Sequence, residues 1–105
     1  MINMAVNPAD GVFRALASLP RRQMLSFLSQ TALSTAELAG RFGMSPPAVS
    51  RHLAVLQRAG LVSSEREGQR VLYRLDRDAL LGALARLADE VDGPLRRRTP
   101  PREAI

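Results

Sequence analysis

The segment from Pro46 to Gly60 offers side chains that can contact nucleic acid, and it contains no acidic residue. It combines Arg51, Arg58 and His52 with small residues. Arginine donates hydrogen bonds to phosphate oxygens or to the acceptor edge of guanine, and short side chains allow a helix to approach the major groove closely. The chemistry on offer is therefore recognition of an anionic polymer rather than cleavage of a covalent bond.

The spacing of apolar residues predicts that residues 46–59 form a helix with two unlike faces. At about 100° per residue, Leu53 and Leu56 fall within about 40° of Val49, so these three residues face the core. The opposite face is small or basic. We expect groove contacts from this helix through Pro47, Ser50, Arg51, His52 and Arg58. A solvated helix face without a partner is the alternative.

His52 lies on a flank of the predicted helix, beside the core-facing residues. That position is compatible with a packing role, which is the usual role of a single histidine. We expect a contact with a base or a phosphate and keep packing as the alternative.

Aromatic residues are few and lie at core-like positions. They are Phe13, Phe27, Phe42 and Tyr73. They leave no stacking platform for unpaired bases, so we expect double-stranded rather than single-stranded nucleic acid.

The charge balance agrees with an anionic partner. The chain has 105 residues, which suits one compact domain, and 15 basic against 10 acidic residues give a formal charge of +5. All the basic residues are arginine, because the sequence contains no lysine. Residues 1–75 are basic, residues 76–95 are acidic and residues 96–105 are basic again. An arginine-rich domain of this kind favours an anionic polymer as its partner.

Several classes of function are excluded by residue types that are missing. The sequence has no cysteine and one histidine, so disulfides, thiolate chemistry and multi-histidine zinc sites cannot form within one chain. A glycine-rich phosphate loop and a nucleophile–histidine–acid set are also missing. We expect no metal, no cofactor and no enzymatic activity. Asp89, Glu90 and Asp92 could bind a hard cation, but we expect a solvated helix end.

No apolar run is long enough to cross a bilayer, and residues 1–11 lack the regions of a signal peptide. We therefore expect a cytoplasmic protein.

Two further helices are expected in the first 30 residues, well before the 46–59 helix. Residues 8–18 have apolar residues at helical spacing, and so do residues 20–29, which begin with a proline suited to a first turn. Arg21 and Arg22 lie at the open end of the second helix.

Capping signals predict a helix-turn-helix. Ser34 and Glu37 match a capping box for a short helix that ends at Gly43. Ser45 then caps the 46–59 helix, which has two prolines in its first turn. Two helices joined by so short a turn form a helix-turn-helix.

After Gly60 the hydrophobic period changes from helical to alternating. Residues 62–65 and 70–75 are strand-like, and a glycine turn separates them. A hairpin directly after the second helix of such a pair is a wing. We expect its turn to contact the DNA backbone or the minor groove through Arg66, Gln69 and Arg70. A mixed-charge hairpin without this role is the alternative, because two glutamates are interleaved.

A last helix completes the predicted fold. Asp76 or Asp78 caps it, it ends near Asp92-Gly93-Pro94, and its apolar residues recur on one face. The fold class is mainly α with a small β-hairpin, a winged helix-turn-helix of order α-α-α-α-β-β-α. We expect residues 1–92 to form one domain and residues 93–105 to be a disordered basic tail.

On these residues the sequence resembles the ArsR-type winged helix-turn-helix repressors, over roughly residues 9–92. The most specific part is Ser-Arg-His-Leu at residues 50–53. The other matching segments are 13–17, 20–22, Leu25, 35–39, 45–49, Leu56, 59–62 and 67–75.

The resemblance implies a homodimer that binds an imperfectly palindromic operator and represses transcription, including that of its own operon. It places groove contacts around Ser45, Ser50, Arg51 and His52. It also implies that the first and last helices pack between subunits, and the apolar stripe of the last helix has little core of its own to cover. The expected interface consists of Val12, Phe13, Leu16, Leu80, Leu84, Leu87 and Val91.

The chain departs from this family where its members sense metals or thiols. A Cys-x-Cys motif of metal sensors would fall at Ser34 and Ala36, and the last helix has no histidine. The resemblance therefore implies a member without these sites, whose signal is a small molecule, a partner protein or nothing. Two alternatives stay open at this point: an activator rather than a repressor, and a winged-helix module that binds protein without specific DNA binding.

Overall fold

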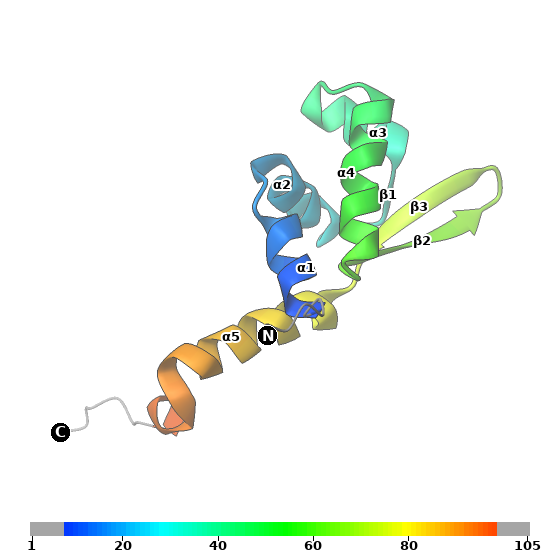
Figure 1. Cartoon of the computed structure of the whole chain (residues 1–105). Helices are drawn as coiled ribbons and strands as arrows, with labels where there is room; N and C mark the ends of the chain where they lie inside the picture. Colours follow the sequence, from blue (N-terminus) through cyan, green and yellow to red (C-terminus); the bar gives the residue numbers. More distant parts are fainter. Residues whose placement is uncertain (1–7, 99–105) are drawn as a thin grey trace.

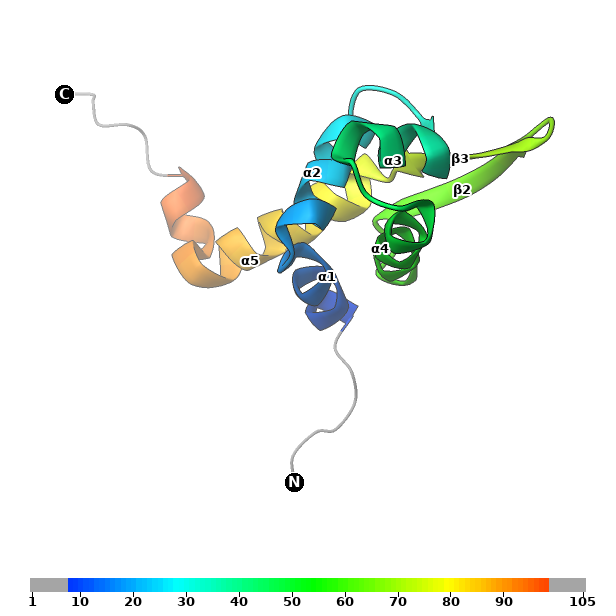
Figure 2. The same ribbon diagram turned by 90° about the horizontal axis from the view of Figure 1, so that it is seen from above.

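The computed structural model describes the backbone of residues 8–98 and the side chains of residues 10–93. The helices are α1 (Pro8–Leu16), α2 (Leu19–Leu28), α3 (Thr35–Phe42), α4 (Pro46–Arg58) and α5 (Arg77–Arg98), and the strands are β1 (Leu33–Ser34), β2 (Val62–Glu67) and β3 (Arg70–Leu75). Helices α1–α4 form a head from which the β2–β3 ribbon and α5 extend on opposite sides (Figure 1). The view from above shows the same arrangement, with α4 beside the base of the ribbon (Figure 2).

The helix-turn-helix forms where the capping signals predicted it. The Ser34 hydroxyl accepts from the Glu37 amide at 3.2 Å, and the Glu37 carboxylate accepts from the Ser34 amide at 2.8 Å, which completes the capping box of α3. Gly43 ends α3 in the left-handed conformation at φ +65°. The Ser45 hydroxyl accepts from the Ala48 amide at 3.3 Å and caps α4. The winged helix-turn-helix fold class is confirmed.

The wing belongs to a three-stranded antiparallel sheet of order β1-β3-β2, one strand more than the sequence predicted. β2 and β3 pair from Val62 opposite Leu75 to Glu67 opposite Arg70, so the turn has two residues and begins with Gly68 at φ +64°. β1 is two residues long and pairs with β3. So short a strand has no alternating pattern of its own, and only its partner defines it.

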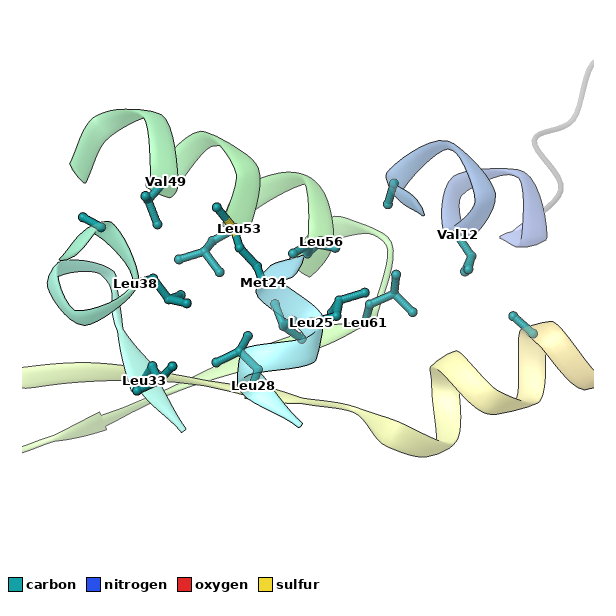
Figure 3. Close-up of a cluster of buried hydrophobic side chains, with 14 residues drawn as sticks. Val12, Met24, Leu25, Leu28, Leu33, Leu38, Val49, Leu53, Leu56 and Leu61 are labelled. Carbon is teal, nitrogen blue, oxygen red and sulfur yellow. The ribbon is translucent and has the colours of Figure 1, made fainter. Parts of the chain in front are cut away.

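The core confirms the two-faced helix expected at residues 46–59. Val49, Leu53 and Leu56 are all fully buried. They pack with leucines and a methionine from α2, α3, β1 and the segment after α4, as Figure 3 shows; these side chains are Met24, Leu25, Leu28, Leu33, Leu38 and Leu61. Because this core fixes one face of α4, the opposite face must point outward.

α5 begins where predicted and continues further than predicted. Asp76 is the cap, since its carboxylate accepts from the Ala79 amide at 3.0 Å. Gly93, at φ 80° and ψ 162°, interrupts the helix at the expected stop. Helical backbone then resumes as far as Arg98, because Pro94 suits the first turn of a new helix. The rest of the predicted tail, residues 99–105, lies outside the described residues, and the domain boundary at residue 92 stays a prediction.

Within residues 8–98, no helix combines the length and the apolar character needed to cross a membrane.

Candidate nucleic-acid interface

The outward face of α4 carries unpartnered positive charge. Pro47, Ser50, Arg51 and Arg58 are all exposed. Neither arginine makes a hydrogen bond or an ion pair with another described residue, so both guanidinium groups keep all their donors for an external acceptor. The structure thus places these four predicted residues together on one accessible surface.

Ser45 lies at the start of this surface with its hydroxyl oxygen committed to the helix cap. A hydroxyl has one donor besides its acceptor lone pairs, so the Ser45 proton stays available to an external oxygen. Capping and contact with a phosphate are therefore compatible in one side chain.

A basic groove extends the surface from α4 to α1. It has a volume of about 450 Å³ and is lined by Gly11, Arg14, Ala15, Arg21, Val55 and Arg58. None of these lining residues is acidic, so the groove is suited to an anion. Arg14 belongs to this surface but was not predicted from the sequence. It lies near Arg58 only because α1 packs on α4, and no local signal indicates that packing.

A hydrogen bond fixes the wing relative to α4. The Gln57 side-chain amide donates to the Ser64 hydroxyl at 3.1 Å, across the junction of α4 and β2. The base of the wing is therefore tied to the side of α4 that carries Gln57.

The arginines of the wing differ in their freedom. Arg66 and Gln69 are exposed, and Arg66 has no partner among the residues that the structure describes. Arg70, by contrast, forms an ion pair with Glu37 of α3 at 2.8 Å, and Arg74 forms one with Glu65 at 2.9 Å. The hairpin thus combines both expectations, a free cation at its tip and a mixed-charge body.

The environment of Glu37 keeps it ionised as the partner of Arg70. Its pKa is lowered from the ordinary value of 4.5, first by the hydrogen bond from the Ser34 amide and then by the charge of Arg70, with partial burial opposing both. Sequence reasoning assigned Glu37 to the capping box and missed this second partner, which lies on a different element.

His52 is half-buried, and its imidazole lies against an arginine of α2. The Nη1 atom of Arg21 lies 3.3 Å from the Nδ1 atom of His52. Burial first, and then the positive charges of Arg21 and Arg51, lower the pKa of His52 below its ordinary value of 6.5. The ring is therefore neutral at neutral pH.

Arg21 is a further residue that sequence reasoning placed only at an open helix end. Its Nε donates to the Ala15 carbonyl at 2.7 Å and its Nη2 to the Arg14 carbonyl at 3.2 Å, so it closes the end of α1. The same guanidinium then reaches α4, and no local signal in the sequence indicates this.

A second surface lies on α5 and is apolar. Leu81, Leu84, Leu87 and Val91 are 54%, 42%, 41% and 78% exposed. Leu80 is half-buried and packs on the core together with Leu16, while Phe13 of α1 is half-buried as well.

Val12 differs from the other predicted interface residues. It is only 8% exposed and belongs to the core of its own chain. Little of its side chain is left for a partner, because α1 turns this side toward the protein interior. Leu81, which the sequence analysis did not select, takes a place in the exposed stripe.

The α5 stripe continues into an apolar cavity between α2 and α5. The cavity has a volume of about 400 Å³, and leucines from α1, α2, β3 and α5 line it, with Arg22 and Arg77 also in the lining. Among the described residues, no group of three or more histidine, cysteine, aspartate or glutamate side chains could hold a metal ion.

This fold and this site define a nucleic-acid-binding protein of the winged helix-turn-helix class. The defining features are the helical head, the capped turn, the basic outward face of α4 and the adjacent wing. A sequence model of the family described as "Bacterial regulatory protein, arsR family" matches residues 20–64.

Relatives identified by sequence are named as transcriptional regulators. The regulator KmtR of Mycobacterium tuberculosis is 43% identical over 67 residues, which cover 64% of this chain and 52% of KmtR. The repressor SdpR of Bacillus subtilis is 32% identical over 71 residues, covering 68% and 79% of the two chains. The activator HlyU of Vibrio cholerae is 42% identical over 74 residues, covering 69% and 68%. This chain therefore spans about half of the length of KmtR and more than two thirds of the other two.

Solved structures agree with these relatives. An ArsR-like transcriptional regulator from Rhodococcus superimposes with a TM-score of 0.75 at 32% identity, covering 87% of this chain and 85% of that one. A homodimeric winged helix-turn-helix DNA-binding domain from Mycobacterium bovis gives a TM-score of 0.67 at 31% identity, covering 81% and 82%. The chain belongs to the ArsR family of winged helix-turn-helix transcriptional regulators, which confirms the predicted family and the expectation of a regulator rather than an enzyme.

Proposed function

We propose that this chain is a cytoplasmic homodimer that binds a palindromic operator in duplex DNA through α4 and the wing and represses transcription, including that of its own operon. The observation that carries the proposal is the outward face of α4, where Arg51 and Arg58 have no partner among the described residues and the helix has no acidic residue.

The roles on α4 follow from position. Arg51 lies at the middle of the exposed face, where it can reach the acceptor edge of a guanine. Ser50 is its exposed neighbour, and Ser45 and Pro47 lie at the helix N-terminus, the end that recognition helices commonly present to base edges. Arg58 lies in the basic groove beside Arg14, so we assign this pair to the phosphate backbone rather than to bases.

The wing supplies a smaller contact. Arg66 is free to meet a phosphate, and Gln69 has a donor and an acceptor at the tip. Arg70 donates to Glu37 through Nη2 and keeps its other donors for DNA. Because Glu37 already neutralises part of its positive charge, we expect Arg70 to attract a phosphate less strongly than Arg66 does. We therefore expect the wing to add affinity without much sequence preference.

The α5 stripe and the adjoining cavity are the proposed dimer surface. Four large apolar side chains along α5 are exposed, and the cavity beside them is apolar. A second copy of the chain packed on this surface would remove both from water. The related domain from Mycobacterium bovis is described as homodimeric, which supports this arrangement. Phe13, Leu16, Leu80, Leu84, Leu87 and Val91 keep their predicted role in the proposal, and Leu81 joins them.

We propose repression rather than activation. Relatives of both kinds are named, among them the repressor SdpR and the activator HlyU. A two-fold dimer on an operator occupies both successive major grooves and excludes other proteins from that segment. The chain has no cysteine, so its signal, where it has one, is a small molecule or a partner protein rather than a thiol reaction.

Selection of random duplex fragments by the purified protein, followed by sequencing, tests the proposed function. We expect an inverted repeat whose half-sites lie about 10–10.5 base pairs apart, or a multiple of that spacing. Fragments without any shared sequence would contradict specific binding and favour the protein-interaction module. A shared sequence without symmetry would contradict the dimer.

Sedimentation velocity tests the dimer surface separately. Leu87→Glu should raise the dimer dissociation constant by at least about tenfold, because it would bury an unpaired charge. Val71→Glu is the matched control, since Val71 is another exposed apolar residue but lies on the wing, on the opposite side of the head from α5 (Figure 2). Equal behaviour of the two variants would place the interface elsewhere.

A further inference from the structure

We propose that Arg21 is a positioning residue that fixes the tautomer of His52, so that Nε2 carries the ring proton and is offered to DNA as a hydrogen-bond donor. The inference rests on the proposed function, and it concerns a residue of α2 that lies outside the recognition helix and the wing.

Arg21 is held in place before it reaches His52. Its Nε and Nη2 atoms donate to the Ala15 and Arg14 carbonyls at the end of α1, at 2.7 and 3.2 Å. The planar guanidinium is therefore fixed at two of its three nitrogens, and the third, Nη1, lies 3.3 Å from His52 Nδ1. The position of the donor does not depend on His52.

The chemistry of the two groups then decides where the proton lies. A guanidinium group has donors only and stays protonated, so it cannot accept a hydrogen bond from an imidazole. Nδ1 must therefore be the acceptor, and a neutral ring with an acceptor at Nδ1 has its hydrogen on Nε2. The lowered pKa of His52 agrees with a neutral ring in this contact.

The remaining nitrogen of the ring is accessible. His52 makes no second hydrogen bond to any described residue. No side-chain nitrogen or oxygen in the described, non-exposed residues is both buried and without a partner, so Nε2 must have contact with solvent. The ring thus presents one N–H group at the flank of α4, next to Arg51.

The direction of this hydrogen bond has consequences for recognition. A donor at Nε2 matches guanine N7 or O6, adenine N7, thymine O4 or a phosphate oxygen, whereas cytosine offers only an amino donor in the major groove. The other tautomer would instead turn Nε2 into an acceptor for amino groups. Arg21 thereby selects which partners His52 can have.

Nitrogen NMR of the imidazole ring tests the tautomer directly, and because His52 is the only histidine its signals need no assignment. At a pH above about 7.5, where the ring is neutral, we expect a protonated Nε2 and an unprotonated Nδ1 in the folded wild type. A protonated Nδ1 in the wild type would overturn the proposal without recourse to any variant.

Arg21→Met should shift both ring nitrogens toward the averaged values of the chain unfolded in urea, and it should raise the pKa of His52 by removing an adjacent cation. Arg22→Met is the matched control: Arg22 also closes α1, through a hydrogen bond from Nη1 to the Leu16 carbonyl at 2.6 Å, but forms no hydrogen bond with His52. Unchanged nitrogen shifts in Arg21→Met, or equal changes in both variants, would contradict the assigned role.

A double-mutant cycle on a selected operator connects the tautomer to DNA. Arg21→Met should weaken binding by about 2- to 10-fold, the effect of one hydrogen bond, and should have no further effect in a His52→Ala background. Loss of preference at one base pair in His52→Ala would identify a base as the acceptor, and uniform loss would identify a phosphate.

The two claims fail in different ways. Specific binding by the wild type combined with additive effects of Arg21→Met and His52→Ala would overturn the role of Arg21 and leave the proposed function standing. Failure of the wild type to prefer any DNA sequence would overturn the proposed function, whereas the tautomer would still be decided by the ring-nitrogen shifts of the free protein.

Discussion

α4 and the wing carry the same kind of side chain in two different states. Arg51 and Arg58 of α4 point outward without a partner in the described part of the chain, whereas Arg70 and Arg74 of the wing already pair with carboxylates. A formal charge count treats the two regions alike. An arginine that must share or give up an ion pair gains less from a phosphate than a free one does, so α4 should supply specificity and most of the affinity.

The largest effect should come from Arg51→Ala. We expect a loss of about 1–3 kcal/mol in operator binding and a relaxed preference at one base pair, because Arg51 lies centrally on the free face of α4. Fluorescence anisotropy with the operator and with single-pair variants measures both. Arg86→Ala, an exposed arginine on α5, removes the same charge elsewhere. A loss no greater than that of Arg86→Ala would remove Arg51 from the interface.

Arg66→Ala should have a smaller and more uniform effect. Arg66 lies near the tip of the wing without a partner among the described residues, and we expect it to contact a phosphate. Its loss should weaken binding to all duplexes alike and reduce the slope of log K against log salt by about one. Titrations at several salt concentrations measure this slope. A loss confined to certain sequences would show instead that the wing reads bases.

Glu37→Gln should free Arg70 of the wing from its ion pair, so that it can bind DNA as we propose for the arginines of α4. Glutamine keeps the capping box of α3, but it no longer neutralises Arg70. We expect the salt slope of DNA binding to rise by about one and the stability to change little, since an exposed ion pair contributes little. Glu67→Gln is the control, because it removes an equal charge from a wing carboxylate that has no ion pair with any described residue. Equal results for the two variants would mean that Arg70 is not restrained by Glu37.

The smallest effect concerns His52 and pH. Its pKa is lowered in the folded chain, so the unfolded chain binds the proton more readily once the pH falls below 6.5. The free energy of unfolding should therefore decrease as the pH falls from about 7.5 to about 5.5, and this part of the decrease should be missing in His52→Gln. Urea unfolding at a fixed protein concentration measures it. A wild type no more sensitive to pH than the variant would contradict the lowered pKa.

Local signals in the sequence predicted most of the fold. The caps at Ser34, Ser45 and Gly43 and the two faces of α4 each depend on residues within a few positions of one another, which is the range over which capping and helical periodicity act. The interruption at Gly93 was likewise expected from local residues, as a stop, but the helical backbone that resumes after it was not predicted.

What the sequence did not reveal is long-range. β1 has no pattern until β3 pairs with it. Glu37 and Arg70 are 33 residues apart, and Arg21 and His52 are 31 apart, so only the packing of different elements makes them partners. These contacts decide which arginines are free and which tautomer His52 adopts, and so they determine how the predicted residues can act.

The central claim is that α4 gives this chain a sequence-specific affinity for duplex DNA. The most direct test compares binding of the wild type to its selected operator and to a shuffled duplex of equal length and composition at moderate, fixed salt. We predict a preference of about a thousandfold or more for the operator, as specific regulators show. Equal affinity for the two duplexes would contradict the account.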